Sequence, residues 1–147
     1  MIQYCKASDV RDLACSIVDR LNLMNVKKDR LLFYRSMGSR SKYTRARIHG
    51  LSRIWNDALE IDPIYVIEVI SEKYDNLPDH EKEKVVIHEL LHVPKGFSGG
   101  FVSHGPSISK HRIESLHQAY HESFRESIPA EAVPRTPVFL ESGFLSR

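Results

Sequence analysis

The sequence predicts a single α+β domain in which helices pack against a small sheet. Two observations predict helices: residues 8–24 repeat apolar side chains at intervals of three and four, and residues 85–93 (VVIHELLHV) form an apolar run behind a charged segment. A third observation predicts the sheet, because residues 64–70 (IYVIEVI) are rich in β-branched and aromatic side chains. A length of 147 residues suits one domain with its own core.

Three helices are expected. The first covers residues 8–24. The second opens near residue 75 and ends just past His92, because Pro94 disfavours helical geometry in the residue before it. The third covers residues 107–125, where apolar side chains again form a stripe.

The strands are expected mainly between the first and second helices. Short apolar or aromatic runs predict strands at residues 30–35, 46–49 and 52–55, in addition to residues 64–70. Trp55 is expected to pack in the core or on a face of the sheet. The proline before residue 64 suits the start of a strand at the edge of a sheet, where a missing amide hydrogen is tolerated.

The carboxy-terminal residues differ in composition from the rest of the chain. Prolines at positions 129, 134 and 137 prevent a long helix there, and residues 138–145 are expected to be a docked strand or a tail. We therefore predict one domain over residues 1–147, with residues 128–147 as a proline-containing extension.

The composition is that of an ordinary soluble globular protein, with 41% hydrophobic and 27% charged residues. Charged residues interrupt the amino terminus, and no apolar run reaches membrane-spanning length, so a cytoplasmic protein without a membrane partner is expected. Cys5 and Cys15 form neither a Cys-x-x-Cys pair nor an obvious disulfide framework. Both are expected to be small buried or half-buried thiols.

An H-E-x-x-H motif lies in the apolar run of the second helix, from His88 to His92. Residues four apart on a helix share a face, so both imidazoles can bind one metal ion. Glu89 is offset by one residue, which places its carboxylate beside the metal, where it can take a proton from water. The alternatives are a chance match and a pair of satisfied core histidines. Metal binding is favoured because it satisfies three polar groups in an apolar segment together.

A catalytic zinc site usually has three protein ligands and one open position. The favoured third ligand is His104, because the glycine-rich segment after Pro94 allows the chain to return to the helix. Glu114 and Glu122 in the last helix are the alternatives, and the competing interpretation of these residues is a solvated helix face. His117 in the same helix is expected to pack in the core or to hydrogen-bond a metal ligand.

Residues 46–105 resemble the metallopeptidases of archaea and of their viruses and phages. The likeness is carried by the segments ARIHGLSRIW, YVIEVISEKYDNLP, VVIHELLHVPKGFSGG and SHG, of which HELLHVPKGFSGG and the His-Gly pair are the most specific. These proteins look like relatives of the SprT-like zinc proteases, in which the third zinc-binding histidine is likewise followed by glycine. The resemblance implies zinc-ligand roles for His88, His92 and His104 and a catalytic role for Glu89.

The resemblance also implies a zincin-like fold, in which a small, mostly antiparallel sheet packs on a central metal-binding helix with flanking helices. In such folds an edge strand can hold an extended substrate by main-chain hydrogen bonds, and this geometry suits a peptide substrate. Many SprT-like proteins carry a C-terminal Cys-x-x-Cys zinc ribbon. The sequence has none, so the resemblance gives little support to a DNA-repair role.

The net charge is only +2, but the charges are unevenly distributed. Residues 27–53 contain nine basic residues and one acidic residue, whereas residues 54–83 contain nine acidic and two basic residues. Clustered Arg and Lys attract phosphates, so nucleic acid is one interpretation. Its contacts would be Arg40, Lys42, Arg45 and Arg47. The favoured interpretation is that the two segments pair with each other or that the charges are solvated.

Together these observations predict a zinc-dependent peptidase. Zn²⁺ would be held by His88, His92 and His104, with Glu89 as the general base and a peptide or protein as the substrate. Two other functions stay open: a non-catalytic, zinc-stabilised nucleic-acid-binding module, and a zinc hydrolase that acts on a non-peptide substrate.

Overall fold

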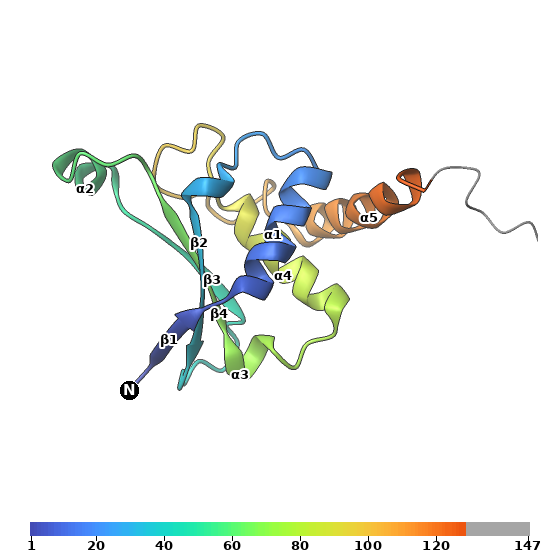
Figure 1. Cartoon of the computed structure of the whole chain (residues 1–147), viewed down its shortest axis with the longest axis horizontal. Helices are drawn as coiled ribbons and strands as arrows, with labels where there is room; N and C mark the ends of the chain where they lie inside the picture. Colours follow the sequence, from blue (N-terminus) through green and yellow to red (C-terminus); the bar gives the residue numbers. More distant parts are fainter. Residues whose placement is uncertain (129–147) are drawn as a thin grey trace, which may run out of the picture.

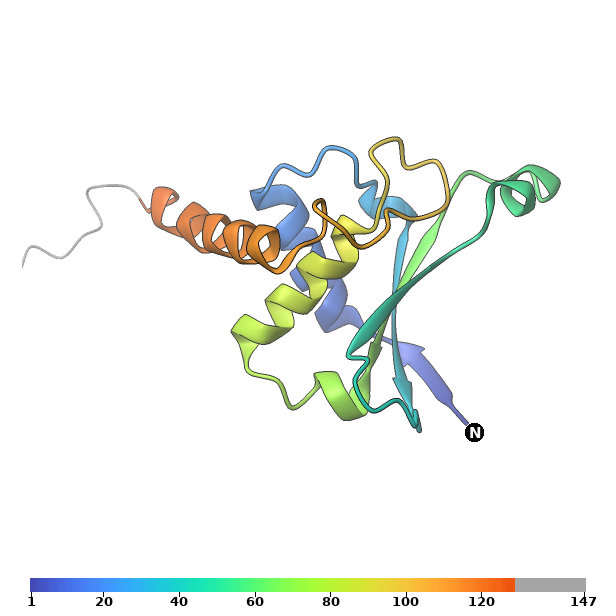
Figure 2. The same cartoon turned by 180° about the vertical axis from the view of Figure 1, so that it is seen from behind.

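The computed structural model describes residues 1–128, so the proline-containing extension and its expected strand lie outside the described residues, apart from residue 128. The described residues form an α+β arrangement, as predicted. The strands are β1 (Gln3–Lys6), β2 (Leu31–Met37), β3 (Ala46–Gly50) and β4 (Tyr65–Ile70), and the helices are α1 (Ser8–Arg20), α2 (Arg53–Ala58), α3 (Ser71–Tyr74), α4 (Asp79–Leu91) and α5 (Lys110–Glu126). Figures 1 and 2 show α1, α4 and α5 on one side of the sheet.

The four strands form one mixed sheet in the order β1-β2-β4-β3. The central strands β2 and β4 are parallel, with Leu31 opposite Tyr65, and the outer strands β1 and β3 pair antiparallel. The expected sheet was mostly antiparallel. Two of the three strand pairings are antiparallel, and the central pairing is parallel because β4 also pairs with β2, from which it is separated in the chain by β3. The strand after Pro63, β4, lies in the centre of the sheet. This proline lies outside the ladder, so its missing hydrogen leaves the central strand intact.

The core lies between the sheet and the helices α1 and α4. Its buried members include Val10, Ala14 and Ile17 of α1, Val86, Ile87 and Leu90 of α4, and Phe33, Tyr65, Ile67 and Val69 of the sheet. The carboxy-terminal half of α4, which carries the H-E-x-x-H motif, is therefore held against the sheet by its buried residues Val86, Ile87 and Leu90.

The predicted strand at residues 52–55 is wrong, because this segment begins α2. A short apolar run without strict alternation does not distinguish a strand from a helix. The backbone N–H groups of Trp55 and Asn56 both donate to the Ser52 carbonyl oxygen, which closes the first helical turn. Trp55 is 57% exposed and does not pack in the core. Figure 1 shows α2 at the far end of the β3–β4 connection, away from the other helices.

Several boundaries also differ from expectation. The first helix ends at Arg20, and Asn22 soon afterwards has a left-handed φ of 52° that cannot continue a helix. The last helix starts at Lys110, because the Ser109 hydroxyl caps it by accepting the Arg112 N–H at 3.1 Å. Strand β1 was not expected from the sequence, and its Cys5 is exposed where a buried or half-buried thiol was predicted.

Candidate metal centre

The end of α4 presents polar side chains on a helix that otherwise faces the core. His88 is half-buried and lies in the last turn, and His92 is the C-cap residue, buried to 8% exposure. Four residues apart, their imidazoles lie on the same face of the helix. Glu89 lies between them in the sequence and is 7% exposed. The helix ends at Leu91, slightly before the predicted end just past His92.

Residues 93–104, named the ligand loop, bring the chain back to the end of α4. Gly99 and Gly100 have φ values of 86° and 74°, a left-handed conformation that glycine adopts without strain. After this turn, the Val102 N–H donates to the His92 carbonyl oxygen at 2.9 Å. The return of the chain, which the glycine-rich sequence predicted, places His104 over the end of the helix.

The ligand loop is also anchored to the sheet through Tyr65. The hydroxyl of Tyr65 donates to the Gly100 carbonyl oxygen at 2.9 Å. The Tyr65 ring makes edge contacts with Phe97, at 5.0 Å between centroids, and with Phe101, at 5.9 Å. Tyr65 and Phe97 are both buried. Sequence reasoning did not assign Tyr65 this role, because the contact joins residues more than thirty positions apart.

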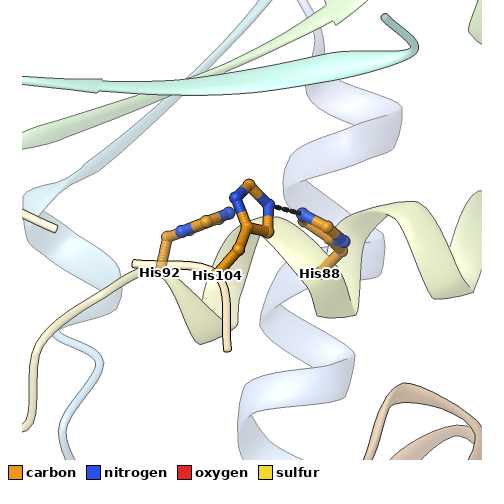
Figure 3. Close-up of side chains that lie close together, drawn as sticks. All are labelled: His88, His92 and His104. Atoms are coloured by element: carbon orange, nitrogen blue, oxygen red, sulfur yellow. Dashed lines mark hydrogen bonds between the residues drawn. The ribbon is translucent and has the colours of Figure 1, made fainter. Parts of the chain in front are cut away.

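The structure brings together His88, His92 and His104, named the histidine cluster (Figure 3). The Nε2 atoms of His88 and His104 are 3.0 Å apart. The ring centroids are separated by 4.6 to 5.1 Å, and one nitrogen from each ring lies within 4.8 Å of the others. Three imidazoles from α4 and the ligand loop thus share one small volume.

Hydrogen bonding and burial keep these imidazoles ready to act as ligands. The Nδ1 of His92 lies 2.7 Å from the Val102 carbonyl oxygen. A carbonyl oxygen can only accept, so Nδ1 carries the hydrogen and Nε2 presents its lone pair. Burial, followed by the neighbouring rings of His92 and His104, lowers the pKa of His88 below its ordinary 6.5. The neutral imidazole, which is the metal-binding form, is favoured.

The carboxyl of Glu89 lies in the buried part of α4. Burial raises the pKa of Glu89 from 4.5 to about 7. A group with a pKa near neutrality can both accept and release a proton at physiological pH. Together with His88, Glu89 lines a cleft of about 290 Å³, named the α4–α5 cleft; its other lining residues are Tyr43, Arg45, Ala46, Glu81, Lys84, Val85 and Ile113.

The donor atoms of the histidine cluster fit a transition-metal ion. Three imidazole nitrogens suit Zn²⁺ and related ions, whereas Ca²⁺ and Mg²⁺ require oxygen ligands. The fixed tautomer of His92 supports the same assignment, because its free lone pair points into the cluster and its N–H points away from it.

The alternative ligands in the last helix lie elsewhere. Glu114 is exposed and pairs with Lys84 at 2.9 Å, a hydrogen bond that lowers the pKa of its carboxyl. Glu122 is exposed and accepts a hydrogen bond from Gln118. Neither belongs to the histidine cluster. His117 does not contact the cluster's ligands, and instead lies 2.6 Å from Glu83.

The uneven charge of the sequence is partly matched within the fold. Arg45 pairs with Glu81 at 3.3 Å, and Arg47 approaches Glu68 at 3.7 Å. These pairs join the basic and acidic segments, which agrees with the favoured interpretation. Arg40 and Lys42, the other two suggested nucleic-acid contacts, are exposed in the connection between β2 and β3. Nucleic-acid binding stays a prediction.

The family comparison agrees with the chemistry of the site. The family model described as "Putative phage metallopeptidase" matches residues 2–122, and the chain belongs to this family. A metallopeptidase family implies a hydrolase that uses a metal ion. Neither the curated proteins nor the solved structures that were searched contain a match to the chain. Among residues 1–128, no helix is long and apolar enough to span a lipid bilayer.

Proposed function

We propose that the protein is a zinc-dependent peptidase with a peptide or protein substrate, and that its family is related to the SprT-like zinc proteases. The observation that carries this proposal is the convergence of His88, His92 and His104 beside the buried carboxylate of Glu89. A catalytic zinc site has such a donor set, with three protein ligands and one coordination position left for solvent. A structural site would instead have four protein ligands, and the cluster in residues 1–128 has three.

The three histidines would hold the zinc ion, and Glu89 would move the proton. When bound, zinc supplies Lewis-acid chemistry, by acidifying a water molecule and polarising the scissile carbonyl. Glu89 would accept the proton of the attacking water and deliver it to the leaving amine. The buried position of Glu89, with a pKa of about 7, suits both transfers.

The α4–α5 cleft and strand β3 are the proposed substrate site. β3 is an edge strand of the sheet, and its outer side has no partner strand in residues 1–128. Its first residue, Ala46, lines the same cleft as His88 and Glu89. An extended peptide added alongside β3 would form main-chain hydrogen bonds with this edge and present a carbonyl group to the site.

The experiment that tests this proposal replaces Glu89 with glutamine. Glu89→Gln keeps the size of the side chain but removes the proton acceptor, and the exposed α5 residue Glu122 provides the matched control, Glu122→Gln. Hydrolysis of an unfolded protein substrate and bound zinc are measured for both variants and the wild type. We expect Glu89→Gln to lose about 10²- to 10⁴-fold in rate while retaining zinc, and Glu122→Gln to behave as the wild type.

Two results would contradict the proposal. Hydrolysis at the wild-type rate by Glu89→Gln would show that Glu89 is not the base. A zinc-loaded wild type that hydrolyses no peptide would favour a non-catalytic metal site or a different substrate. If that zinc-loaded protein instead bound DNA with an affinity that falls steeply with salt, the nucleic-acid-binding alternative would replace the peptidase.

A further inference from the structure

A second group of metal-ligating side chains lies between α4 and α5. It consists of Glu83, His117 and His121, named the α4–α5 cluster. The Nε2 atoms of both histidines lie 2.6 Å from the same carboxylate oxygen, Oε2 of Glu83. The two rings meet edge to face, with centroids 4.6 Å apart. One ligand atom from each residue lies within 4.8 Å of the other two.

The α4–α5 cluster is separate from the histidine cluster. Glu83 precedes His88 by five residues, which turns it about 140° around the α4 axis at 3.6 residues per turn. Its partners come from α5, whereas the histidine cluster is completed by the ligand loop. The two groups share no residue. The second group therefore needs an explanation of its own.

In the part of the chain that the structure describes, no lysine or arginine side chain forms an ion pair with Glu83. Within residues 1–128, the ion pairs of Glu83 involve His117 and His121 alone, and the adjacent Lys84 pairs with Glu81 and Glu114. The side chains of Glu83 and His117 are each 14% exposed. A largely buried carboxylate is costly unless it is paired. A divalent cation bound by all three side chains would neutralise it.

We propose that Glu83, His117 and His121 form a second site for a divalent transition-metal ion, with zinc as the expected occupant. Two imidazoles and one carboxylate suit Zn²⁺, Co²⁺ or Ni²⁺, while Ca²⁺ and Mg²⁺ prefer oxygen ligands. Metal–ligand distances of about 2.0 to 2.2 Å place tetrahedral ligands about 3.3 Å apart, so the Glu83 oxygen, 2.6 Å from each imidazole nitrogen, needs to move away from them by less than about 1 Å. His121 is 53% exposed, which gives an ion access from solvent.

The site would clamp α5 to α4. Tyr120 is the buried residue of α5, and the apolar attachment of this seventeen-residue helix is otherwise limited to partly buried side chains such as Ile113 and Leu116. Ile113 lines the α4–α5 cleft together with His88 and Glu89. An ion joining the two helices would therefore stabilise one wall of that cleft, whatever reaction takes place in it.

The test is a count of bound zinc ions per chain, made on the full chain after removal of any histidine tag. Equilibrium dialysis against excess zinc, followed by metal analysis, is applied to the wild type, to His121→Ala and to His111→Ala. His121 is exposed and outside the core, so its replacement leaves the fold intact, and His111 is an exposed α5 histidine outside both clusters. We expect two ions for the wild type, one for His121→Ala and two for His111→Ala.

The outcomes separate this proposal from the peptidase proposal. An equal count for the wild type and His121→Ala, whether one or two, overturns the second site. A count of one for the wild type and none for His121→Ala supports the second site and removes the histidine cluster as a zinc site. As a second readout, zinc is expected to raise the melting temperature of His88→Ala, which keeps the α4–α5 cluster. Absence of that rise also counts against the clamp.

Discussion

The side chain and the backbone of His92 both hydrogen-bond to Val102. The Nδ1–H of His92 donates to the Val102 carbonyl oxygen at 2.7 Å, and the Val102 N–H donates to the His92 carbonyl oxygen at 2.9 Å. One residue of the ligand loop thus fixes the tautomer of one proposed ligand. Two residues later, the same loop supplies another, His104. The side chain of Val102 takes part in neither bond.

Replacing Val102 with proline tests this link. Val102→Pro removes the N–H that bonds to His92, and we expect zinc affinity at the histidine cluster to fall about 10- to 100-fold, because the partners that orient ligands contribute that much. Val102→Ala keeps both backbone bonds and should bind zinc as the wild type does. Competition with a chelating dye measures both affinities in a His121→Ala background. Equal affinities for the proline and alanine variants would show that this bond pair does not position the ligands.

Gly50, the last residue of β3, packs against the residues that anchor the ligand loop. A Cβ atom at this position would lie 2.9 Å from Cδ1 of Tyr65 and 3.3 Å from Cζ of Phe101. The Tyr65 side chain is fully buried, so the surrounding core hinders its movement away from an added methyl group. We expect Gly50→Ala to lower the free energy of unfolding by about 1 to 3 kcal/mol, as overpacking of cores does.

The control variant for Gly50→Ala is Gly96→Ala, in the ligand loop. A Cβ on Gly96 would meet its nearest neighbour, Oγ of Ser98, at 3.7 Å, which is an ordinary contact. Gly96→Ala should therefore leave stability nearly unchanged. Urea unfolding of both variants and the wild type makes the comparison. Coincident midpoints for Gly50→Ala and Gly96→Ala would mean that the packing around Tyr65 is looser than the structure indicates.

Tyr74 is expected to make the fold sensitive to alkaline pH. Burial, followed by the charge of Asp9, raises the pKa of Tyr74 from 10.0 to about 12. The folded state then holds the phenolic proton more tightly than the unfolded state, so this stability is present below pH 10 and lost as the pH rises through about 12. The loss amounts to at most about 3 kcal/mol, at 1.36 kcal/mol per pKa unit.

Tyr74→Phe should remove that part of the alkaline destabilisation. The control is Tyr4→Phe, because the Tyr4 side chain is 61% exposed and folding changes its surroundings little. Unfolding free energies are measured below pH 10 and near pH 12 for both variants and the wild type. If the unfolding free energy of Tyr74→Phe fell between these two pH values as much as that of Tyr4→Phe, the phenol of Tyr74 would not titrate differently in the folded state.

The histidine cluster could be found in the sequence because its geometry is largely local. His88 and His92 share a helix face by their spacing alone. The glycines after Pro94 allow the chain to turn back to the helix, so His104, the next histidine in the sequence, was the favoured third ligand. What the sequence could not provide was the contact that holds the loop in place, since Tyr65 is distant in the chain and reads only as a core aromatic.

The remaining differences arise from contacts that depend on tertiary packing. Strand β1 is exposed along its length, so no apolar alternation marks it. The α4–α5 cluster depends on how α5 is rotated against α4, and periodicity alone does not indicate that His117 faces Glu83. The charge asymmetry suggested nucleic acid, although two of its arginines, Arg45 and Arg47, face acidic partners across the fold.

The most direct test of the account is anomalous diffraction at the zinc absorption edge, from crystals of the zinc-loaded protein. We predict a peak about 2.0 to 2.1 Å from the Nε2 atoms of His88, His92 and His104. A peak confined to the α4–α5 cluster would not meet this prediction. Zinc-loaded crystals with no peak among the three histidines, or with the ring of His104 turned away from the other two, would contradict the proposed catalytic centre.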